Sequence, residues 1–285
     1  MPSVAQLTPG KPVDGIFACT RKDRLTARSG APYLALELRD RTGTVTARAF
    51  RDVDFLAAQF ERGDLVQVQG RAERFRDELQ LEVSAIRRAA ETDADPADFL
   101  PVAYRDVDEL DGFLEHLARE VHDAGLRRLL DAFFTDDDLR AQFRRAPCTL
   151  AGHHAYLGGL LEHTVAVGTL VTETGVLHPR VNTDVLMTAA LLHDVGKVRE
   201  FDYAAEIALS DEGRLVGHIA LGLQMIEERG RGVDRATLLA VQHCVLTHHG
   251  PDAAPARRFG SPEAVALYRL NAVDTAVKGA LEHGL

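Results

Sequence analysis

Five short stretches within the first 90 residues have the alternating pattern of β-strands, and they constrain the fold more than any other feature of the chain. Apolar and polar residues alternate in them and β-branched residues are frequent, as expected for strands with one buried face. Turn-forming residues at 29–32 and 40–43 separate the first three stretches. The five predicted strands are residues 13–21, 33–39, 44–50, 65–71 and 78–86.

A short helical segment at residues 52–61 lies between the third and fourth predicted strands. Five strands with one helix in this place is the order of an OB-fold barrel. One face of such a barrel commonly binds single-stranded nucleic acid, with aromatic rings that stack on bases and basic side chains that contact phosphates. The alternative for each aromatic residue is a place in the barrel core.

The first domain offers several residues for such a face. The aromatic candidates are Phe17, Tyr33, Phe50 and Phe75, and the basic candidates are Arg21, Lys22, Arg24, Arg48, Arg74 and Arg76. Among them, the predicted substrate contacts are Tyr33, Phe50, Arg48 and Arg74.

Residues 91–101 are acidic and punctuated by proline, which is typical of a linker. Hydrophobic residues then recur at three- and four-residue spacing from Val107 onward, which predicts helices, and the rest of the chain is nearly all α. We therefore expect a multidomain α+β protein. Its parts would be a five-stranded OB-fold β-barrel at 1–90, a linker with connecting helices at 91–149 and an all-α helical bundle at 150–285.

Charge is divided unevenly along the chain, whose net charge is −10. Residues 1–90 hold fifteen Lys and Arg against twelve Asp and Glu, whereas the remainder holds eighteen against thirty-one. A mildly basic part could contact phosphates, and an acidic part usually offsets its charge with solvent or bound cations.

The sequence also bears on the compartment. The N-terminus lacks the basic start and apolar core of a secretory signal, and no apolar run is long enough to span a bilayer. The three cysteines, Cys19, Cys148 and Cys244, are too far apart for a Cys-x-x-Cys site. We expect a cytoplasmic protein with no membrane partner and with free thiols in a reducing compartment.

His193 and Asp194 follow an apolar helical run and precede Gly196, which can end a helix. An imidazole and a carboxylate together suit a divalent transition metal, although such a pair can also be an ordinary polar patch at a helix end. Further candidate ligands sit on predicted helices or at their ends, flanked by apolar residues, which favours convergence on the interior of a bundle. These candidates are His153, His154, His163, His218, His248, His249 and Asp274.

The order of these residues resembles the HD-domain superfamily of metal-dependent phosphohydrolases, over roughly residues 150–280. The resemblance implies that one metal is held by His163, His193, Asp194 and Asp274. It also implies that Asp194 bridges to a second ion, which is held by His218 and by His248, His249 or both.

One position departs from the pattern of that superfamily. Members often carry two acids one helical turn apart near the last motif, where this chain has Asn271 and Asp274. We expect Asp274 to be the ligand because an anion offsets more of the cation's charge.

A narrower resemblance comes from the barrel and the helical motifs together. An OB-like module followed by these His and Asp motifs is similar to the YhaM-type 3′→5′ exoribonucleases over nearly the full chain. The resemblance implies metal-dependent hydrolysis of RNA from a 3′ end, with manganese or cobalt favoured. The direction and the RNA preference are implied by the resemblance alone.

This resemblance leads to an expected mechanism. We expect two divalent ions, manganese first and cobalt, iron, nickel or zinc as alternatives, with Asp194 as the catalytic carboxylate that bridges them. A hydroxide that also bridges the metals would attack phosphorus in line. Lys197 would neutralise charge on the phosphate; its alternative is an exposed lysine at a helix end. His153 and His154 would bind the leaving group or the penultimate phosphate, or else pack behind the ligands.

Three other functions fit parts of the pattern. A nucleotide or cyclic-nucleotide phosphohydrolase would share the helical site, but it would not need the barrel. A nuclease for single-stranded DNA and a non-catalytic single-strand binding protein are the others. The expected partner is single-stranded RNA, with single-stranded DNA as the alternative, and a homo-oligomer is left open.

Overall fold

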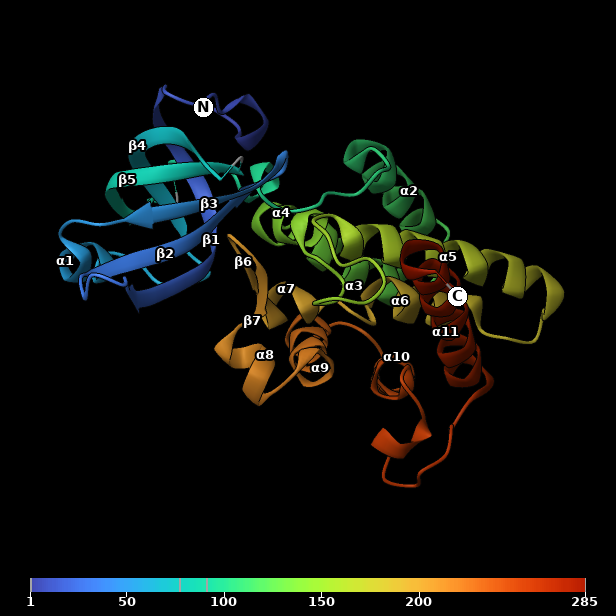
Figure 1. The fold of residues 1–285 in the computed structure, drawn as a ribbon. Helices are drawn as coiled ribbons and strands as arrows, with labels where there is room; N and C mark the ends of the chain where they lie inside the picture. The colour runs from blue at the N-terminus through green and yellow to red at the C-terminus, as the bar shows by residue number, and fades with distance from the viewer. Residues whose placement is uncertain (1, 77, 91, 285) are drawn as a thin grey trace. The chain divides into compact units, whose positions relative to one another are not determined.

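The computed structural model describes residues 2–76, 78–90 and 92–284, and its contacts divide the chain into two compact units (Figure 1). The first unit consists of Met1–Pro101 together with Tyr203–Ile207. The second consists of Val102–Asp202 and Ala208–Leu285. Strands dominate the first unit and helices the second, so the predicted α+β fold class is confirmed.

The first unit is a closed barrel of five strands, drawn in blue to cyan in Figure 1. Around the barrel the order is β1-β2-β3-β5-β4, in which β3 and β5 pair in parallel and the other neighbours pair antiparallel. This is the arrangement of an OB-fold. The elements are β1 (Pro12–Thr26), β2 (Pro32–Asp40), β3 (Gly43–Ala49), α1 (Val53–Ala57), β4 (Leu65–Phe75) and β5 (Glu78–Arg88).

Alternation along the strands explains the barrel core. On β2, Leu34, Leu36 and Leu38 are at most 3% exposed, while the residues between them are only partly buried. Burying each such leucine stabilises the fold by about 2 kcal/mol. Phe17 of β1 belongs to the same core and is 0% exposed. Its candidacy for base stacking is therefore wrong, because its ring is not accessible.

The residues after β5 are not a purely solvated linker. Phe99, next to the 3-10 helix η2 (Pro96–Asp98), is 4% exposed and packs with Ile16 and Ala205. Arg39 Nη2 donates a hydrogen bond to the carbonyl oxygen of Ala205 at 2.9 Å. The first unit therefore extends to Pro101, past the boundary predicted at residue 90.

The second unit is a helical bundle that also contains the ends of a small hairpin, β6 (Phe201–Tyr203) and β7 (Ile207–Leu209). The helices are α2 (Val107–Arg119), α3 (Ala124–Phe134), α4 (Asp137–Arg145), α5 (Gly159–Leu177), α6 (Thr183–Leu192), α7 (Lys197–Glu200), α8 (Asp211–Leu215), α9 (His218–Arg229), α10 (Arg235–Thr247) and α11 (Pro262–His283), with the 3-10 helix η3 at Pro251–Ala253. One hydrophobic cluster joins most of these helices, with residues from α2 to α6 and from α9 to α11.

Helix α6 lies at the centre of this bundle. All its residues from Val185 to Leu192 are buried, as expected of a helix that is apolar on every side. Its start is capped by Asn182, whose side chain accepts a hydrogen bond from the backbone of Val185 at 3.1 Å. The C-terminal end of α6, at Leu192, therefore lies in the protein interior. Among the described residues, no helix is both long enough and apolar enough to cross a membrane.

Candidate metal centre

Asp194 lies in the interior of the helical unit. It comes two residues after the last residue of α6, and His193 closes that helix. Because α6 is buried along its length, both side chains arrive in the core, where His193 is 0% and Asp194 2% exposed. Such burial is unusual for an ordinary polar patch at a helix end, which is the alternative that the sequence left open.

One carboxylate oxygen of Asp194, Oδ2, faces two histidines and a lysine. His193 Nε2 lies at 3.3 Å and His163 Nε2, from α5, at 3.6 Å. The two Nε2 atoms are 3.1 Å apart. Lys197 Nζ lies 3.1 Å from the same oxygen. The structure thus brings together three of the four ligands predicted for the first ion.

The other oxygen of Asp194, Oδ1, faces a second group of histidines. His218 Nε2 and His248 Nε2 each lie at 3.4 Å from it. His249 Nε2 lies 3.3 Å from His218 Nε2. His218 begins α9 and His248 closes α10. Asp194 therefore stands between two groups of donors, which is the position required of a carboxylate that bridges two ions.

The four histidines around Asp194 share one hydrogen-bond pattern. In each ring, Nδ1 lies near a protein oxygen that accepts its hydrogen, so that Nε2 keeps a free lone pair. The pairs are His163 with Asp274 Oδ2 at 2.6 Å, His193 with the Ala190 carbonyl at 2.8 Å, His218 with Glu200 Oε1 at 2.9 Å and His248 with the Val245 carbonyl at 2.6 Å. The tautomers are therefore set for metal binding through Nε2.

The electrostatics of the group fit a divalent ion. Asp194 Oδ1 and His248 Nε2 are buried without a hydrogen-bond partner in the described part of the chain. Burial lowers the pKa of His163 to about 4, so this imidazole is neutral at neutral pH. Burial alone would raise the pKa of Asp194, but Lys197 and His193 hold it well below its usual range. Imidazole nitrogens around a carboxylate are a donor set suited to a transition metal.

Asp274 and Asn271, the two polar residues of the last motif, have different partners in the structure. Asp274 Oδ2 contacts His163 Nδ1, on the side of the ring away from Asp194 Oδ2. Asn271 is 4% exposed, and its Nδ2 donates to the carbonyl oxygen of His248 at 3.3 Å. This geometry favours Asp274 as a residue that orients His163, and its role as a direct ligand stays a prediction.

The two histidines predicted to contact phosphate differ in exposure. His154 is 1% exposed, and its nitrogens lie 3.0 Å from Tyr156 Oη and 3.1 Å from Asp274 Oδ2. Both nitrogens are thus used inside the protein, which favours the alternative that His154 packs behind the ligands. His153 is half-buried, and its Nδ1 has no hydrogen-bond partner among the described residues.

Lys197 is 5% exposed, so the alternative of an exposed lysine at a helix end is wrong. Besides Asp194, its Nζ contacts Cys148, donating a hydrogen bond to the carbonyl oxygen at 2.7 Å. Burial alone would lower the pKa of Lys197, but Asp194 together with Cys148 and Glu200 raises it above its usual value. Lys197 is therefore a charged group within the centre.

Cys148 is a residue of the centre that the sequence patterns did not indicate. Its Sγ lies 3.8 Å from Asp194 Oδ2 and 3.5 Å from Lys197 Nζ. With His153 and His163 it forms a trio whose donor atoms all lie within 4.8 Å of one another. Burial raises the pKa of the thiol to about 12. No nearby cysteine accompanies it in the sequence, so the fold alone reveals its position.

Aromatic and basic side chains gather on the outside of the barrel. We call Tyr33, Arg48, Phe50, Phe75 and Arg76 the aromatic strip. The rings of Tyr33 and Phe50 stack with centroids 5.7 Å apart, and Arg48 lies 5.7 Å from the Tyr33 ring and 5.4 Å from that of Phe75. Phe50 is 49% and Phe75 48% exposed. Three of the four predicted substrate contacts thus lie together.

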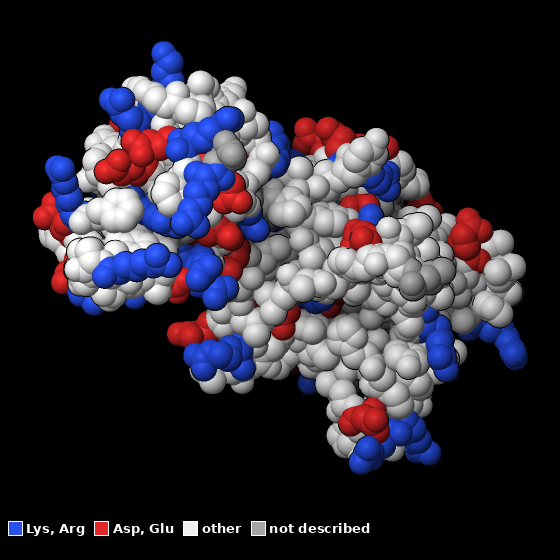
Figure 2. Space-filling view, in the orientation of Figure 1, with Lys and Arg blue, Asp and Glu red and all other residues white. Residues whose placement is uncertain are grey.

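The remaining basic candidates lie outside the strip. Arg74 is exposed, and in the described part of the barrel it makes no cation contact with the rings of the strip. In the view of Figure 2, basic side chains are spread over the visible face of the barrel, with acidic ones between them. Three candidates pair with carboxylates: Arg21 with Asp23, Lys22 with Glu61 and Arg24 with Asp54.

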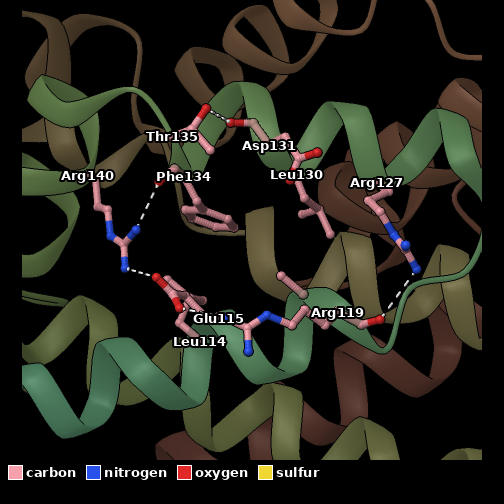
Figure 3. A pocket seen from close by; sticks show the side chains of 10 residues that line it. Leu114, Glu115, Arg119, Arg127, Leu130, Asp131, Phe134, Thr135 and Arg140 are labelled. Atoms are coloured by element: carbon pink, nitrogen blue, oxygen red, sulfur yellow. Dashed lines mark hydrogen bonds and ion pairs between the residues drawn. The ribbon is translucent and has the colours of Figure 1, made fainter.

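A separate pocket of about 250 Å³ opens between α2 and α3 (Figure 3). Leu114, Leu130 and Phe134 give it an apolar lining, and three arginines stand around it. Each arginine is bound to a protein oxygen: Arg119 to Glu115 at 2.9 Å, Arg127 to the Val121 carbonyl at 2.6 Å and Arg140 to Glu115 at 2.5 Å. The Arg140 pair joins α4 to α2, whereas the Arg119 pair lies within α2. None of the predicted site residues lines the pocket.

Comparison with known families agrees with this geometry. Residues 160–276 match the model of the HD domain. The helical unit contains an HD domain. Residues 19–89 match the model of the OB-fold nucleic acid binding domain. The two domain types expected from the sequence are therefore confirmed, and the centre around Asp194 lies within the HD domain.

The chain is also similar to proteins named 3′-5′ exoribonuclease YhaM. That of Oceanobacillus iheyensis is 28% identical over 95% of this chain and 86% of its own length. That of Listeria monocytogenes is 27% identical over 94% and 86%. Among solved structures, the second OB-fold domain of replication protein A from Methanococcus maripaludis covers 31% of this chain and 94% of its own, with 17% identity and a TM-score of 0.26. The assignment of the barrel as an OB-fold therefore rests on its strand order and not on this structural likeness.

Proposed function

We propose that this protein is a metal-dependent 3′→5′ exoribonuclease that hydrolyses the phosphodiester bonds of single-stranded RNA. The observation that carries the proposal is the set of histidine Nε2 atoms that face both oxygens of Asp194. The HD domain and the relatives named 3′-5′ exoribonuclease support a metal-dependent hydrolase. The polarity and the preference for RNA are carried over from those relatives.

Two groups of residues would hold the metal. When bound, a divalent ion activates water near neutral pH and stabilises the negative charge of the phosphate. The resemblance implies manganese, and the imidazole-rich donor set also suits cobalt, iron, nickel and zinc. The first group is His163, His193 and Asp194, with Asp274 as a further ligand or as a positioning residue, and the second is Asp194, His218, His248 and His249.

The other side chains of the centre orient these ligands or add charge near them. Glu200 fixes the ring of His218, and Asp274 fixes that of His163. Lys197 supports the negative charge of Asp194 and adds positive potential to the site. His153, being half-buried, is better placed than His154 to contact a phosphate of the substrate.

The aromatic strip supports a polymer as the substrate. Exposed rings next to guanidinium groups are the surface on which single-stranded nucleic acid stacks and binds its phosphates. A hydrolase for free nucleotides has no need of such a surface. This observation favours the nuclease over a nucleotide phosphohydrolase.

Digestion of end-blocked oligonucleotides with added Mn²⁺ tests the proposal. We expect the protein to degrade 5′-blocked single-stranded RNA and a 3′ block to protect the RNA. Asp194→Ala should lose activity by at least about a hundredfold, because loss of a residue that only supports a ligand already costs up to about that much. Asp211→Ala is the control, since that carboxylate is 89% exposed. Full activity of Asp194→Ala would exclude the metal mechanism. Equal digestion of 3′-blocked RNA would overturn the polarity, and preferred cleavage of DNA or of free nucleotides would assign the substrate to those classes.

A further inference from the structure

Cys148 places a sulfur atom at the edge of the metal centre. It lies in the segment between α4 and α5 and is 0% exposed. Its Sγ is 3.8 Å from Asp194 Oδ2, the same oxygen that faces His163 and His193. His153, the third member of its trio, has a buried Nδ1 without a hydrogen-bond partner among the described residues. The sulfur therefore belongs to a cluster of donors rather than to an isolated thiol.

The spacing of these donors matches that of ligands around one small ion. With bonds of about 2.0 Å to nitrogen and about 2.3 Å to sulfur, neighbouring ligands of a tetrahedral zinc ion lie roughly 3.3–3.7 Å apart. His163 Nε2 and His193 Nε2 are 3.1 Å apart and lie 3.6 and 3.3 Å from Asp194 Oδ2. Cys148 Sγ lies 3.8 Å from the same oxygen, and it lies within 4.8 Å of a ring nitrogen of His163, so the sulfur stands directly beside these three donors.

The charge around this first group also calls for a further anion. Asp274 is turned to His163 Nδ1, away from the Nε2 that faces Asp194, and Asn271 is neutral. Lys197 Nζ lies 3.5 Å from the sulfur, close enough to stabilise a negative charge on it. A thiolate would thus be the second anion beside Asp194.

We propose that Cys148 is a thiolate ligand of the ion held by His163, His193 and Asp194. The proposal rests on the proposed metal centre and specifies its chemistry. A thiolate favours Zn²⁺, Co²⁺ or Fe²⁺, whereas Mn²⁺ prefers oxygen ligands, so this centre selects against the manganese that the resemblance implied. The S–H bond breaks as the metal–sulfur bond forms, and the proton passes to solvent.

Titration of the chelator-treated full-length protein with Co²⁺ tests this directly. Thiolate bound to Co²⁺ gives a charge-transfer absorption in the near ultraviolet, whereas nitrogen and oxygen ligands give only the weaker visible bands. We expect the charge-transfer band in the wild type and its loss in both Cys148→Ala and Cys148→Ser. The matched control is Cys244→Ala, which should keep the band, because Cys244 is also 0% exposed but lies in the core of α10.

Competition with a chromophoric chelator adds a second measurement. Cys148→Ala should weaken Zn²⁺ binding by at least about tenfold, because loss of a residue that only supports a ligand already weakens metal binding by about 10–100-fold. The same variant should change Mn²⁺ binding less. Unchanged Zn²⁺ affinity in Cys148→Ala and Cys148→Ser, with native circular dichroism, would overturn the proposal.

The two readouts separate this inference from the function on which it rests. Visible cobalt bands without charge transfer in the wild type, or a charge-transfer band that persists in Cys148→Ala, would overturn the thiolate ligand and leave the metal centre standing. Absence of both kinds of band would overturn the metal centre and the thiolate ligand together.

Discussion

At the scale of single residues, the orientation of His163 depends on a contact behind its ring. Asp274 accepts a hydrogen bond from Nδ1 at 2.6 Å, which fixes the ring and its tautomer. If Asp274 acts only in this way, Asp274→Asn should weaken metal binding by about 10–100-fold, the effect typical of a residue that supports a ligand. Isothermal titration of the metal-free protein measures this change.

The same titration of Asp194→Asn provides the comparison for Asp274. Asp194 faces histidines through both of its oxygens, so its replacement should abolish tight binding in both groups. An Asp274→Asn protein that binds metal as poorly as Asp194→Asn would show instead that Asp274 is a direct ligand.

Acid should destabilise the metal-free protein through His163. Burial lowers the pKa of this residue from 6.5 to about 4 in the folded protein. Between pH 6.5 and 4 the unfolded chain binds a proton that the folded protein does not, so stability present above pH 6.5 is lost as the pH falls toward 4. The full effect is about 3 kcal/mol. Urea unfolding at several pH values should show this loss of stability, and the part that comes from His163 should be absent in His163→Gln. If the stability of that variant depended on pH as the wild type does, His163 would not be its cause.

At the scale of elements, α7 and α9 approach closely at Gly196. A Cβ at this position would overlap the carbonyl oxygen of His218 and lie 2.6 Å from the backbone nitrogen of Gly222. Backbone atoms cannot rotate away, so Gly196→Ala must shift the start of α9 and His218 with it. We expect a loss of about 2 kcal/mol in the free energy of unfolding and weaker metal binding.

The facing glycine provides a matched control for Gly196→Ala. A Cβ on Gly222 would meet its nearest atom, the nitrogen of Gly196, at 3.4 Å, an ordinary contact. Alanine also favours a helix over glycine by about 1 kcal/mol. Gly222→Ala should therefore keep or gain stability, and equal losses in the two variants would argue against the close approach as the cause.

Periodic patterns predicted the elements well because burial imposes them locally. All five strands and the helix after the third were expected, although β1 reaches Thr26 and β4 reaches Phe75, beyond the ends predicted at residues 21 and 71. Most residues of the two extensions are exposed or only partly buried, with Ala72 as the exception at 0% exposed, so little alternation marks these strand ends. Antiparallel pairing with β2 and β5 holds them in place.

The candidate centre was predictable only where its residue types are distinctive. Histidines beside apolar helices pointed to a metal, since few other roles gather so many of them. Cys148 gave no such signal, because a single cysteine usually means a buried thiol, and only its distance to Asp194 reveals it. Phe17 failed for a related reason, since alternation does not say which face of a short strand an aromatic ring occupies.

At the scale of the whole molecule, the proposed function assigns recognition and chemistry to different units. The barrel carries the aromatic strip and a small excess of basic residues, whereas the helical unit holds the centre around Asp194 and most of the acidic excess. Binding of a long strand should therefore depend on both units, while cleavage of a small phosphodiester should depend on the helical unit alone.

Removing rings from the aromatic strip tests whether the barrel binds the strand while the helical unit alone cleaves it. Base stacking on an exposed ring contributes about 1–3 kcal/mol, so the Phe50→Ala and Phe75→Ala variants should each weaken binding of single-stranded RNA by roughly 5–150-fold. Hydrolysis of bis(p-nitrophenyl) phosphate should stay unchanged. Phe55→Ala is the control, since Phe55 is 67% exposed on α1 and makes no ring contact in the described part of the barrel. Equal losses on RNA and on the small substrate would mean that the strip supports the fold and does not bind the strand.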